Sequence, residues 1–325
     1  MATIHDVAKK AGVSVTTVSR VLNNRGYISE ETRRKVYRCM EELNYQPNDI
    51  ARSLLRKQSN LIGLIIPNVS HPFFAELANH IEYHAYQRGS KILLCNSQLD
   101  PVKEQDYIDM LKRNRVDGII MGSHTLEVDV YRNLGGKIVT FDRQIDVSIP
   151  YISSDNYMGG QLATRLLIRK GCRKIAHICG NLKLNMLSNR RTSAFIDEVQ
   201  QHNIEHIIVQ TDMNVFDQKQ YERIIRRLFE EHPDIDGIFA TSDIIATFAV
   251  KICHKLKRRV PEDVRIVGYD DVNAASWLVP ALTTVRQPLE EMARSAVDMI
   301  CRQEEERNRE QACVLPVELV ERETT

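Results

Sequence analysis

Short apolar segments alternate with longer amphipathic segments from about residue 61 to the end of the chain. Eight of the apolar segments are candidate strands, at residues 61–67, 91–96, 117–122, 137–142, 174–180, 206–211, 237–243 and 264–271. The stretches between most of them, for example 73–88, 104–114 and 157–170, have the spacing of amphipathic helices. This alternation predicts an α/β fold in which helices cover both faces of parallel sheets. About ten strands are too many for one Rossmann unit, so we expect two similar lobes with a ligand cleft at the carboxyl ends of the strands.

Most of the candidate strands end in polar residues, which would face that cleft. They are Asn68, Asn96, Ser97, Ser123, His124, Asp142, Arg143, Ser242, Asp243, Asp270 and Asp271. Each of them could equally cap the following helix or turn. The sequence contains no G-x-G-x-x-G, Walker, G-x-S-x-G or H-E-x-x-H motif, which argues against a nucleotide site and against a hydrolase. We therefore expect neither an enzyme nor a bound cofactor.

The composition is that of an ordinary soluble globular protein: of 325 residues, 43% are hydrophobic and 27% are charged. No apolar run approaches the roughly 18 to 20 residues of a membrane span, and the first residues lack the apolar stretch of a secretory signal. We therefore expect a cytoplasmic protein without membrane contact. The seven cysteines are odd in number and form no C-x-x-C pair, so we expect reduced thiols and no metal site.

Positive charge is concentrated at the N-terminal end. The first 58 residues hold 11 lysines and arginines against 6 aspartates and glutamates, whereas the remainder holds 33 against 37. A basic head on a mildly acidic body is typical of a protein whose one end contacts phosphates.

Three short helices are predicted in this head. Their apolar faces are Ile4, Val7, Ala8 and Ala11, then Val18, Val21 and Leu22, then Val36, Met40 and Leu43. Thr3, Ser14 and Ser29 precede the three helices as candidate N-caps, and Gly12 can adopt a positive φ after the first. Two short helices joined by a tight glycine-containing turn indicate a helix-turn-helix.

The second helix is the candidate recognition helix. Its polar face offers Val15, Thr16, Thr17, Ser19 and Arg20. Hydroxyl groups and a guanidinium can contact base edges and phosphates, and a valine can contact a thymine methyl group. The alternative is an ordinary solvated helix face.

A short helix is also predicted after the head, starting at Asn48 behind Pro47. It is about two turns long, too short to be stable alone. The pair Leu54–Leu55 lies between Arg52 and Arg56, which suits an apolar wedge in a minor groove with arginines along the backbone. The alternative is an amphipathic linker helix that packs on the body.

The head resembles that of the lac repressor family of bacterial regulators. Residues 4–23 read I-x-D-V-A-x-x-A-G-V-S-x-x-T-V-S-R-V-L-N, and residues 43–54 read L-N-Y-x-P-N-x-x-A-R-S-L. The resemblance implies that Val15, Thr16 and Arg20 read the major groove and that Leu54 enters the minor groove at the operator centre. It places Asn23 and Tyr27 at further DNA-contacting positions.

The body resembles the sensor core of the same family, which is related to periplasmic sugar-binding proteins. The similar stretches include L-I-G-L-I-I-P-N at 61–68, R-x-x-A-F at 191–195, I-V-G-Y-D-D at 266–271 and P-x-L-T-T-V-x-Q-P at 280–288. The resemblance implies three crossings between lobes, near Asn156, Gln287 and Val320. The expected domains are a head at 1–47, a hinge helix and linker at 48–60, and a core at 61–325. In that core, 61–156 and 288–319 form the N-terminal lobe, and 157–287 and 320–325 the C-terminal lobe.

A set of effector-binding residues is expected in the cleft, of which Arg191 and Asp270 match positions where the family holds its effector. The full set is Phe73, Phe74, Asp142, Arg143, Arg191, Phe216, Ser242, Asp243, Asp270 and Trp277. Carboxylates and arginines beside aromatic faces suit a polyol, because charged groups bind adjacent hydroxyls while the ring face stacks. Packing of the aromatic residues in the core, and helix capping by Asp270, are the alternatives.

These features together predict a transcriptional repressor of a carbohydrate-utilisation operon, controlled by a sugar or sugar phosphate. Within the family, the segments at 92–98, 141–143 and 153–156 look most like sucrose operon and ribose operon repressors of Gram-positive bacteria. Because the chain stops at Thr325 without a leucine-heptad tail, a homodimer on a pseudopalindromic operator is expected. The alternative effector is a phosphocarrier protein, as in the catabolite control proteins. A transport receptor and a sugar-processing enzyme are further rivals, which the head and the lack of a catalytic motif disfavour.

Overall fold

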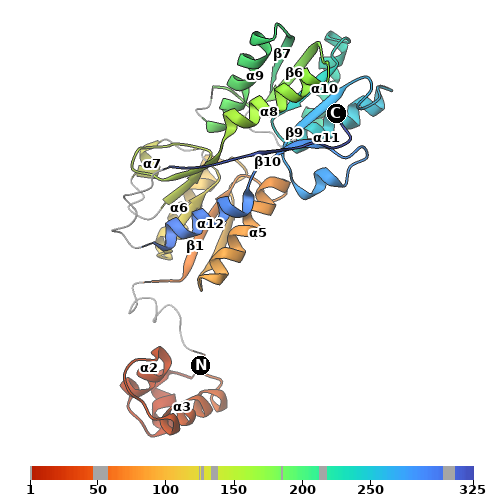
Figure 1. Cartoon of the computed structure of the whole chain (residues 1–325). Coiled ribbons are helices and arrows are strands. Elements are labelled where there is room, and N and C mark those ends of the chain that lie inside the picture. Colours follow the sequence, from red (N-terminus) through yellow and green to blue (C-terminus); the bar gives the residue numbers. More distant parts are fainter. Residues whose placement is uncertain are drawn as a thin grey trace. The chain divides into compact units, whose positions relative to one another are not determined.

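The computed structural model divides the chain into two compact units, Met1–Ser59 and Asn60–Thr325 (Figure 1). It describes residues 2–46, 58–123, 125, 128–132, 138–183, 186–211, 218–302 and 312–325. The predicted hinge helix, with Arg52 and Leu54, and the predicted effector residue Phe216 lie outside the described residues.

The first unit contains three helices within residues 2–46: α1 (Ile4–Ala11), α2 (Val15–Asn23) and α3 (Glu30–Glu42). The predicted caps are confirmed, because Thr3, Ser14 and Ser29 each accept a backbone N–H from the first turn of their helix. Gly12 ends α1 in the left-handed conformation, with φ 62°. The apolar faces close a small core of their own around Val7, Val18, Val21 and Val36.

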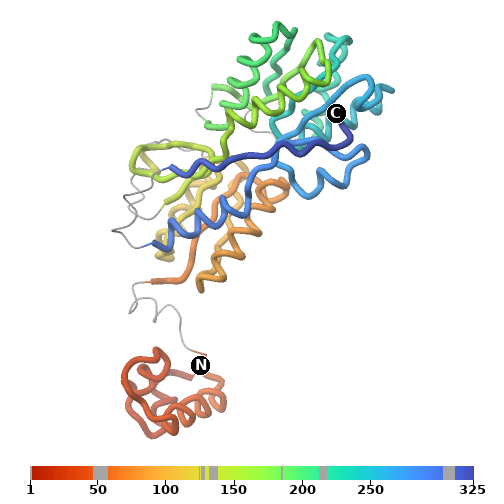
Figure 2. Tube along the Cα trace, viewed as in Figure 1, coloured from red at the N-terminus to blue at the C-terminus, as the bar shows by residue number. Residues whose placement is uncertain are grey.

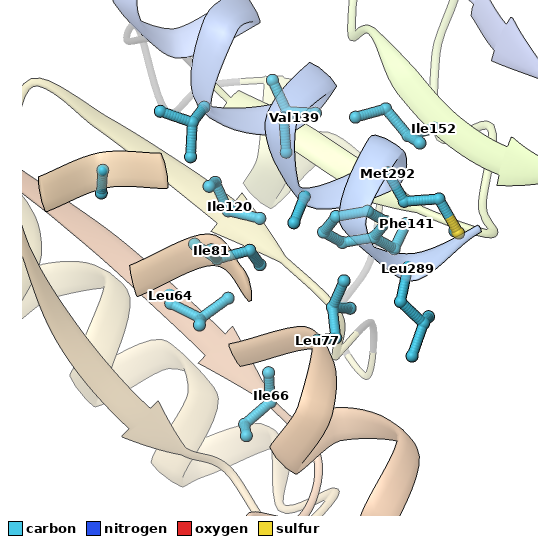
Figure 3. Packing of buried hydrophobic residues seen from close by; sticks show 14 of the residues in the cluster. Leu64, Ile66, Leu77, Ile81, Ile120, Val139, Phe141, Ile152, Leu289 and Met292 are labelled. Atoms are coloured by element: carbon cyan, nitrogen blue, oxygen red, sulfur yellow. The ribbon is translucent and has the colours of Figure 1, made fainter. Parts of the chain in front are cut away.

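The N-terminal lobe of the second unit is built on a sheet of six described strands in the order β11-β5-β4-β3-β1-β2, with all neighbours parallel. Their bounds are β1 Leu61–Ile66, β2 Lys91–Asn96, β3 Gly118–Met121, β4 Ile138–Phe141, β5 Tyr151–Ser154 and β11 Ala312–Leu315. Helices α5 (Pro72–Gln87) and α12 (Leu289–Cys301) cover one face, and α6 (Pro101–Arg113) and α7 (Val128–Arg132) the other. Figure 3 shows side chains of α5 and α12, such as Leu77 and Met292, packed against those of the strands, such as Ile120.

The C-terminal lobe repeats this plan with described strands in the order β12-β10-β9-β8-β6-β7. The bounds are β6 Lys174–Cys179, β7 Glu205–Gln210, β8 Gly237–Ala240, β9 Arg265–Asp270, β10 Thr283–Arg286 and β12 Glu318–Val320. All neighbours are parallel except β10 and β12. Helices α8 (Asn156–Arg169) and α9 (Arg190–Gln201) cover one face, and α10 (Gln218–Glu231) and α11 (Asp243–Lys255) the other. Two short 3-10 helices, η1 (Leu187–Asn189) and η2 (Asn273–Ser276), precede α9 and follow β9.

In the described part of the chain, three segments connect the lobes. They are Asp155 between β5 and α8, residues 287–288 between β10 and α12, and residues 316–317 between β11 and β12 (Figure 2). The third connection comes a few residues before Val320, where the sequence placed it, because β12 is already an edge strand of the C-terminal sheet. No described helix has the length and apolar character needed to span a membrane.

Candidate functional site

A cavity of about 290 Å³ lies between the two lobes, where the carboxyl ends of both sheets meet. Its N-terminal side is lined by His71, Phe73, Phe74, Gly122, Phe141 and Asp142. Its C-terminal side is lined by Cys179, Gly180, Met186, Ser188, Asn189, Arg191, Thr192, Thr241, Ser242, Asp270 and Gln287. Six of the predicted effector residues are therefore brought together: Phe73, Phe74, Asp142, Arg191, Ser242 and Asp270.

Arg191 supplies positive charge to the cavity from the first turn of α9. Its side chain is 5% exposed and is held in place by three groups. Nε donates to Oδ1 of Asn156 at 2.6 Å, one Nη donates to the carbonyl of Thr241 at 2.8 Å, and the guanidinium lies 3.5 Å from the ring centroid of Tyr269. This fixed orientation leaves three of the five N–H groups of the guanidinium to contact a ligand.

Asp142 follows β4 and has a left-handed backbone, with φ 53°. Its Oδ1 accepts hydrogen bonds from Ser153 Oγ at 2.7 Å and from Asn156 Nδ2 at 3.2 Å. No described group donates to Oδ2, so this oxygen can accept a hydrogen bond from a ligand.

Asp270 ends β9 with φ 121°, a backbone conformation that non-glycine residues adopt rarely and that often marks functional positions. Its side chain is 4% exposed, and its Oδ1 accepts from Gln287 Nε2 at 2.8 Å. Burial raises the pKa of Asp270 to about 7, although Arg191 and the bond from Gln287 act in the opposite direction. The carboxyl group can therefore accept a hydrogen bond from a ligand and, when it is protonated, donate one.

The apolar end of the cavity is formed by the start of α5. The rings of Phe73 and Phe74 pack edge to face with centroids 5.1 Å apart, and His71 packs against Phe74 in the same way. Burial lowers the pKa of His71 to about 4, so this imidazole is neutral at pH 7. The cavity thus combines an aromatic face with carboxylate, guanidinium and hydroxyl groups.

The first unit presents the polar face of α2. Thr16 and Arg20 are exposed, while Val15, Thr17, Ser19 and Asn23 are half-buried. Thr17 shares a hydrogen bond with the capping Ser14, and Asn23 donates to the carbonyl of Ser19. Tyr27, in the loop after α2, is 98% exposed. The fold buries Val18 and Val21 and thereby turns Thr16 and Arg20 outward.

Comparison with known proteins shows which protein families match the two units. Residues 3–48 match the model of the bacterial regulatory proteins of the lacI family, and residues 164–325 match that of the periplasmic binding protein-like domain. The chain is 41% identical to the ribose operon repressor of Halalkalibacterium halodurans, over 100% of this chain and 97% of that protein. It is 40% identical to the sucrose operon repressor of Streptococcus mutans, over 100% of this chain and 99% of that protein. The chain belongs to the lacI family of bacterial regulatory proteins.

Solved structures give the same result for this lacI-family protein. The lac repressor dimer bound to operator and the anti-inducer ONPF superimposes with a TM-score of 0.88 at 26% identity, covering 100% of this chain and 99% of that chain. The complex of the transcriptional regulator CelR with cellobiose has a TM-score of 0.71 at 28% identity, with both chains fully covered. The predicted family and the predicted two-lobed fold are confirmed.

Two amides in the lacI-family core were not predicted as site residues. Asn156 joins the N-terminal Asp142 to the C-terminal Arg191, and Gln287 joins Asp270 to Ser154 Oγ, which donates to its Oε1 at 2.7 Å. Both amides are buried and lie at lobe crossings. The signal that could have found them is the position of both residues at predicted lobe crossings.

Asp243 does not line the cavity, in contrast to the prediction. Its side chain is 1% exposed and accepts the backbone N–H of Val272 at 2.9 Å and the Thr284 hydroxyl at 2.5 Å. Burial and the nearby Asp270 raise its pKa well above the usual range of a carboxyl group. The first turn of α11 directs the Asp243 side chain into the lobe. There it holds the segment after β9 in place through the backbone of Val272.

Trp277 and Arg143 also lie outside the cavity lining. Trp277 is 75% exposed, since η2 ends there and turns the indole ring to the surface of the core. Arg143 is half-buried in the loop after Asp142, one residue beyond the position that faces the cleft. In the part of the chain that the structure describes, no group of three or more His, Cys, Asp or Glu side chains is arranged to hold a metal ion.

Proposed function

We propose that this protein is a sequence-specific transcriptional repressor of a carbohydrate-utilisation operon, whose affinity for DNA is controlled by a sugar bound between the core lobes. The observation that carries the proposal is the inter-lobe cavity, which places Asp142, Asp270 and Arg191 beside the rings of Phe73 and Phe74. Relatives at about the same identity are named ribose and sucrose operon repressors, which supports a sugar rather than another small molecule.

The DNA-binding part of the proposal rests on α2. Thr16 and Arg20 are exposed on its polar face, where a hydroxyl and a guanidinium can contact base edges and phosphates. We propose that Val15, Thr17, Ser19, Asn23 and Tyr27 complete the contact surface, and that Arg52 and Leu54 bind the minor groove. A homodimer would present two such heads to a pseudopalindromic operator. The lac repressor, a structural relative, is a dimer on its operator.

The proposed switch is a change in the angle between the lobes. A ligand that contacts Asp142 on one side and Arg191 and Asp270 on the other favours one arrangement of the lobes over another. Because coupling equals the difference in effector affinity between two states, contacts from both lobes to one ligand are what the switch requires. The protein would act in the cytoplasm, without catalysis and without a cofactor.

The test combines two measurements on the full-length chain. Calorimetric titration with ribose, sucrose, fructose and glucose should give saturable binding of one of them. The same sugar should change the affinity for the protein's own upstream operator in a mobility-shift assay. Operator binding with no response to any sugar, but a response to an added phosphocarrier protein, would replace the sugar effector by the catabolite-control alternative.

A further inference from the structure

We infer that the inter-lobe cavity selects an uncharged sugar and rejects the corresponding phosphate ester. The inference rests on the proposed function, because it names the chemical class of the effector that the same site binds. The sequence leaves both classes open, whereas the positions of the charged side chains discriminate between them.

Negative charge outweighs positive charge among the described residues that line the cavity. Above pH 7, Asp142 and Asp270 contribute two carboxylates, and Arg191 contributes one guanidinium. His71 adds no positive charge, because burial lowers its pKa to about 4 and leaves the imidazole neutral at pH 7. A phosphate monoester brings about −1.5 to −2 charges at pH 7. It would enter a site whose fixed charge is already negative.

Two of the five N–H groups of the Arg191 guanidinium, including the one on Nε, are already used within the fold, so bidentate binding through the edge formed by Nε is blocked. Nε is used by Asn156, one Nη by the carbonyl of Thr241, and one face by Tyr269. Bidentate phosphate binding needs two parallel N–H groups of the guanidinium directed at the same anion. The three remaining N–H groups, on the two Nη atoms, can donate to sugar hydroxyls or a ring oxygen.

The carboxylates need hydrogen-bond donors, which sugars have and phosphates lack. Oδ2 of Asp142 receives no hydrogen bond from any described group, and Asp270 is almost fully buried. Sugar hydroxyls can donate to both carboxylates at once. The oxygens of a phosphate dianion are acceptors and would face these carboxylates with like charge.

Of the three helix N-termini at the cavity, those of α9 and α11 are satisfied within the fold, and that of α5, which has no side-chain cap, presents aromatic rings. Helix α5 begins with Pro72, which has no N–H group, and the rings of Phe73 and Phe74 line the cavity there. Helix α11 carries its own cap, Ser242, and a carboxylate, Asp243, in its first turn. Helix α9 continues directly from η1, whose carbonyl oxygens accept the N–H of Arg190.

The experiment compares each sugar with its own phosphate on the full-length protein. Dissociation constants are measured at pH 8 by calorimetry for ribose and ribose 5-phosphate, and for sucrose and sucrose 6-phosphate. For the pair that contains the effector, we expect the phosphate to bind about 100-fold more weakly or not at all, a difference typical of two like charges in a partly buried site.

Two variants separate charge from shape. Asp270→Asn removes one carboxylate from the cavity, and we expect the ratio between phosphate and sugar dissociation constants to fall about tenfold. Asp142→Asn provides the same test from the other lobe if Asp270→Asn does not fold. Asp197→Asn is the matched control, because this carboxylate lies on α9 outside the cavity and binds the Tyr157 hydroxyl. It should leave the ratio unchanged.

The outcomes are distinct for the inference and for the proposed function. A phosphate that binds as tightly as its parent sugar, or more tightly, overturns the inference and leaves the sugar-controlled repressor intact. A ratio that does not respond to either cavity variant overturns the charge argument. If neither the sugars nor their phosphates bind, the proposed effector class fails, and the inference fails with it.

Discussion

At the scale of single residues, the C-terminal lobe holds two carboxyl groups in environments that disfavour their charge. Asp270 and Asp243 are both buried, and both have raised pKa values. Asp243 satisfies its oxygens within the fold, through Val272 and Thr284, whereas Asp270 points into the cavity. Two adjacent strand-end aspartates in one lobe therefore have different roles, one structural and one available to a ligand.

The raised pKa of Asp270 has a consequence for stability. The pKa is about 7 in the folded chain against 3.8 for a free aspartate, so the folded state binds the proton more tightly than the unfolded state. The free energy of unfolding should therefore fall as the pH rises from about 4 to 7, and this group should cost the fold on the order of a few kcal/mol above that range. The groups that face Asp270 are Arg191 on α9, Gln287 at the crossing, Asp142 after β4 and the start of α11.

Asp270→Asn should raise the free energy of unfolding by about 1 to 4 kcal/mol at pH 8, because the amide has no charge to desolvate. The gain should shrink towards zero near pH 4. Urea unfolding of the two proteins at pH 5 and pH 8 measures it, with Asp197→Asn as the exposed control. Equal stability of Asp270→Asn and the parent chain at pH 8 would contradict the assigned cost of burial.

At the scale of elements, close packing of α8 on α9 positions the guanidinium. A side chain at Gly159 would overlap the Tyr269 hydroxyl, and a Cβ at Gly160 would lie 2.5 Å from the carbonyl oxygen of Arg191. Glycine at 160 lets α9 approach α8 closely enough for Arg191 to reach Asn156 at the start of α8, and glycine at 159 makes room for the Tyr269 ring beside the guanidinium.

Gly160→Ala should therefore weaken both the fold and the site. The added methyl group forces the two helices apart, which typically costs about 1 to 3 kcal/mol. We expect a lower melting temperature by calorimetry and weaker effector binding by titration. Gly180→Ala is the control for the melting temperature alone, because nothing lies within 4 Å of a Cβ there but the residue lines the cavity. A melting temperature for Gly160→Ala that matches this control would refute the packing argument.

Helix α2 allows a second test at this scale. Arg20→Ala removes an exposed guanidinium without touching the buried Val18 and Val21. Operator affinity should fall by about 1 to 3 kcal/mol, while the melting of the protein stays unchanged. Lys103→Ala, on α6 of the core, is the control for loss of one positive charge. Unchanged operator affinity in Arg20→Ala would exclude α2 as the recognition helix.

At the scale of the whole core, the two lobes are joined at the cleft by amides as well as by the chain. Asn156 bonds to Asp142 of one lobe and to Arg191 of the other, and Gln287 bonds to Ser154 and Asp270 in the same way. A ligand that contacts the same charged residues changes the hydrogen bonds that these residues form with the two amides. The crossings are therefore where occupancy of the cavity can be converted into a change of lobe angle.

Asn156→Ala tests this connection, because Asn156 does not itself line the cavity. Its loss leaves Nε of Arg191 without an acceptor, so we expect the free energy of unfolding to fall by about 1 to 3 kcal/mol. In addition, saturating effector should change the operator affinity of the variant by a smaller factor than it changes that of the parent chain. The mobility-shift assay with and without effector measures it. A destabilised variant with the full effector response would reduce Asn156 to a structural role.

The sequence by itself determined the head and the architecture of the core. The helices of the head are specified by local signals, namely the caps Thr3, Ser14 and Ser29 and the 3.6-residue apolar spacing, so they could be predicted residue by residue. The alternation of strands and helices likewise specified two mainly parallel sheets, although the edge strands β11 and β12, whose residues are exposed or half-buried, have no apolar run that would mark them.

Only the tertiary structure decided which polar strand ends form the site. Asp243 and Asp270 look alike in the sequence, but the first turn of α11 directs one into the lobe and the end of β9 directs the other into the cavity. Ser154 and Gln287 are 133 residues apart and still share a hydrogen bond, so no local pattern contains their pairing. Trp277 was misplaced for the same reason, because burial depends on which elements pack over a residue. Local periodicity specifies elements, whereas a binding site depends on side chains that long-range packing brings together.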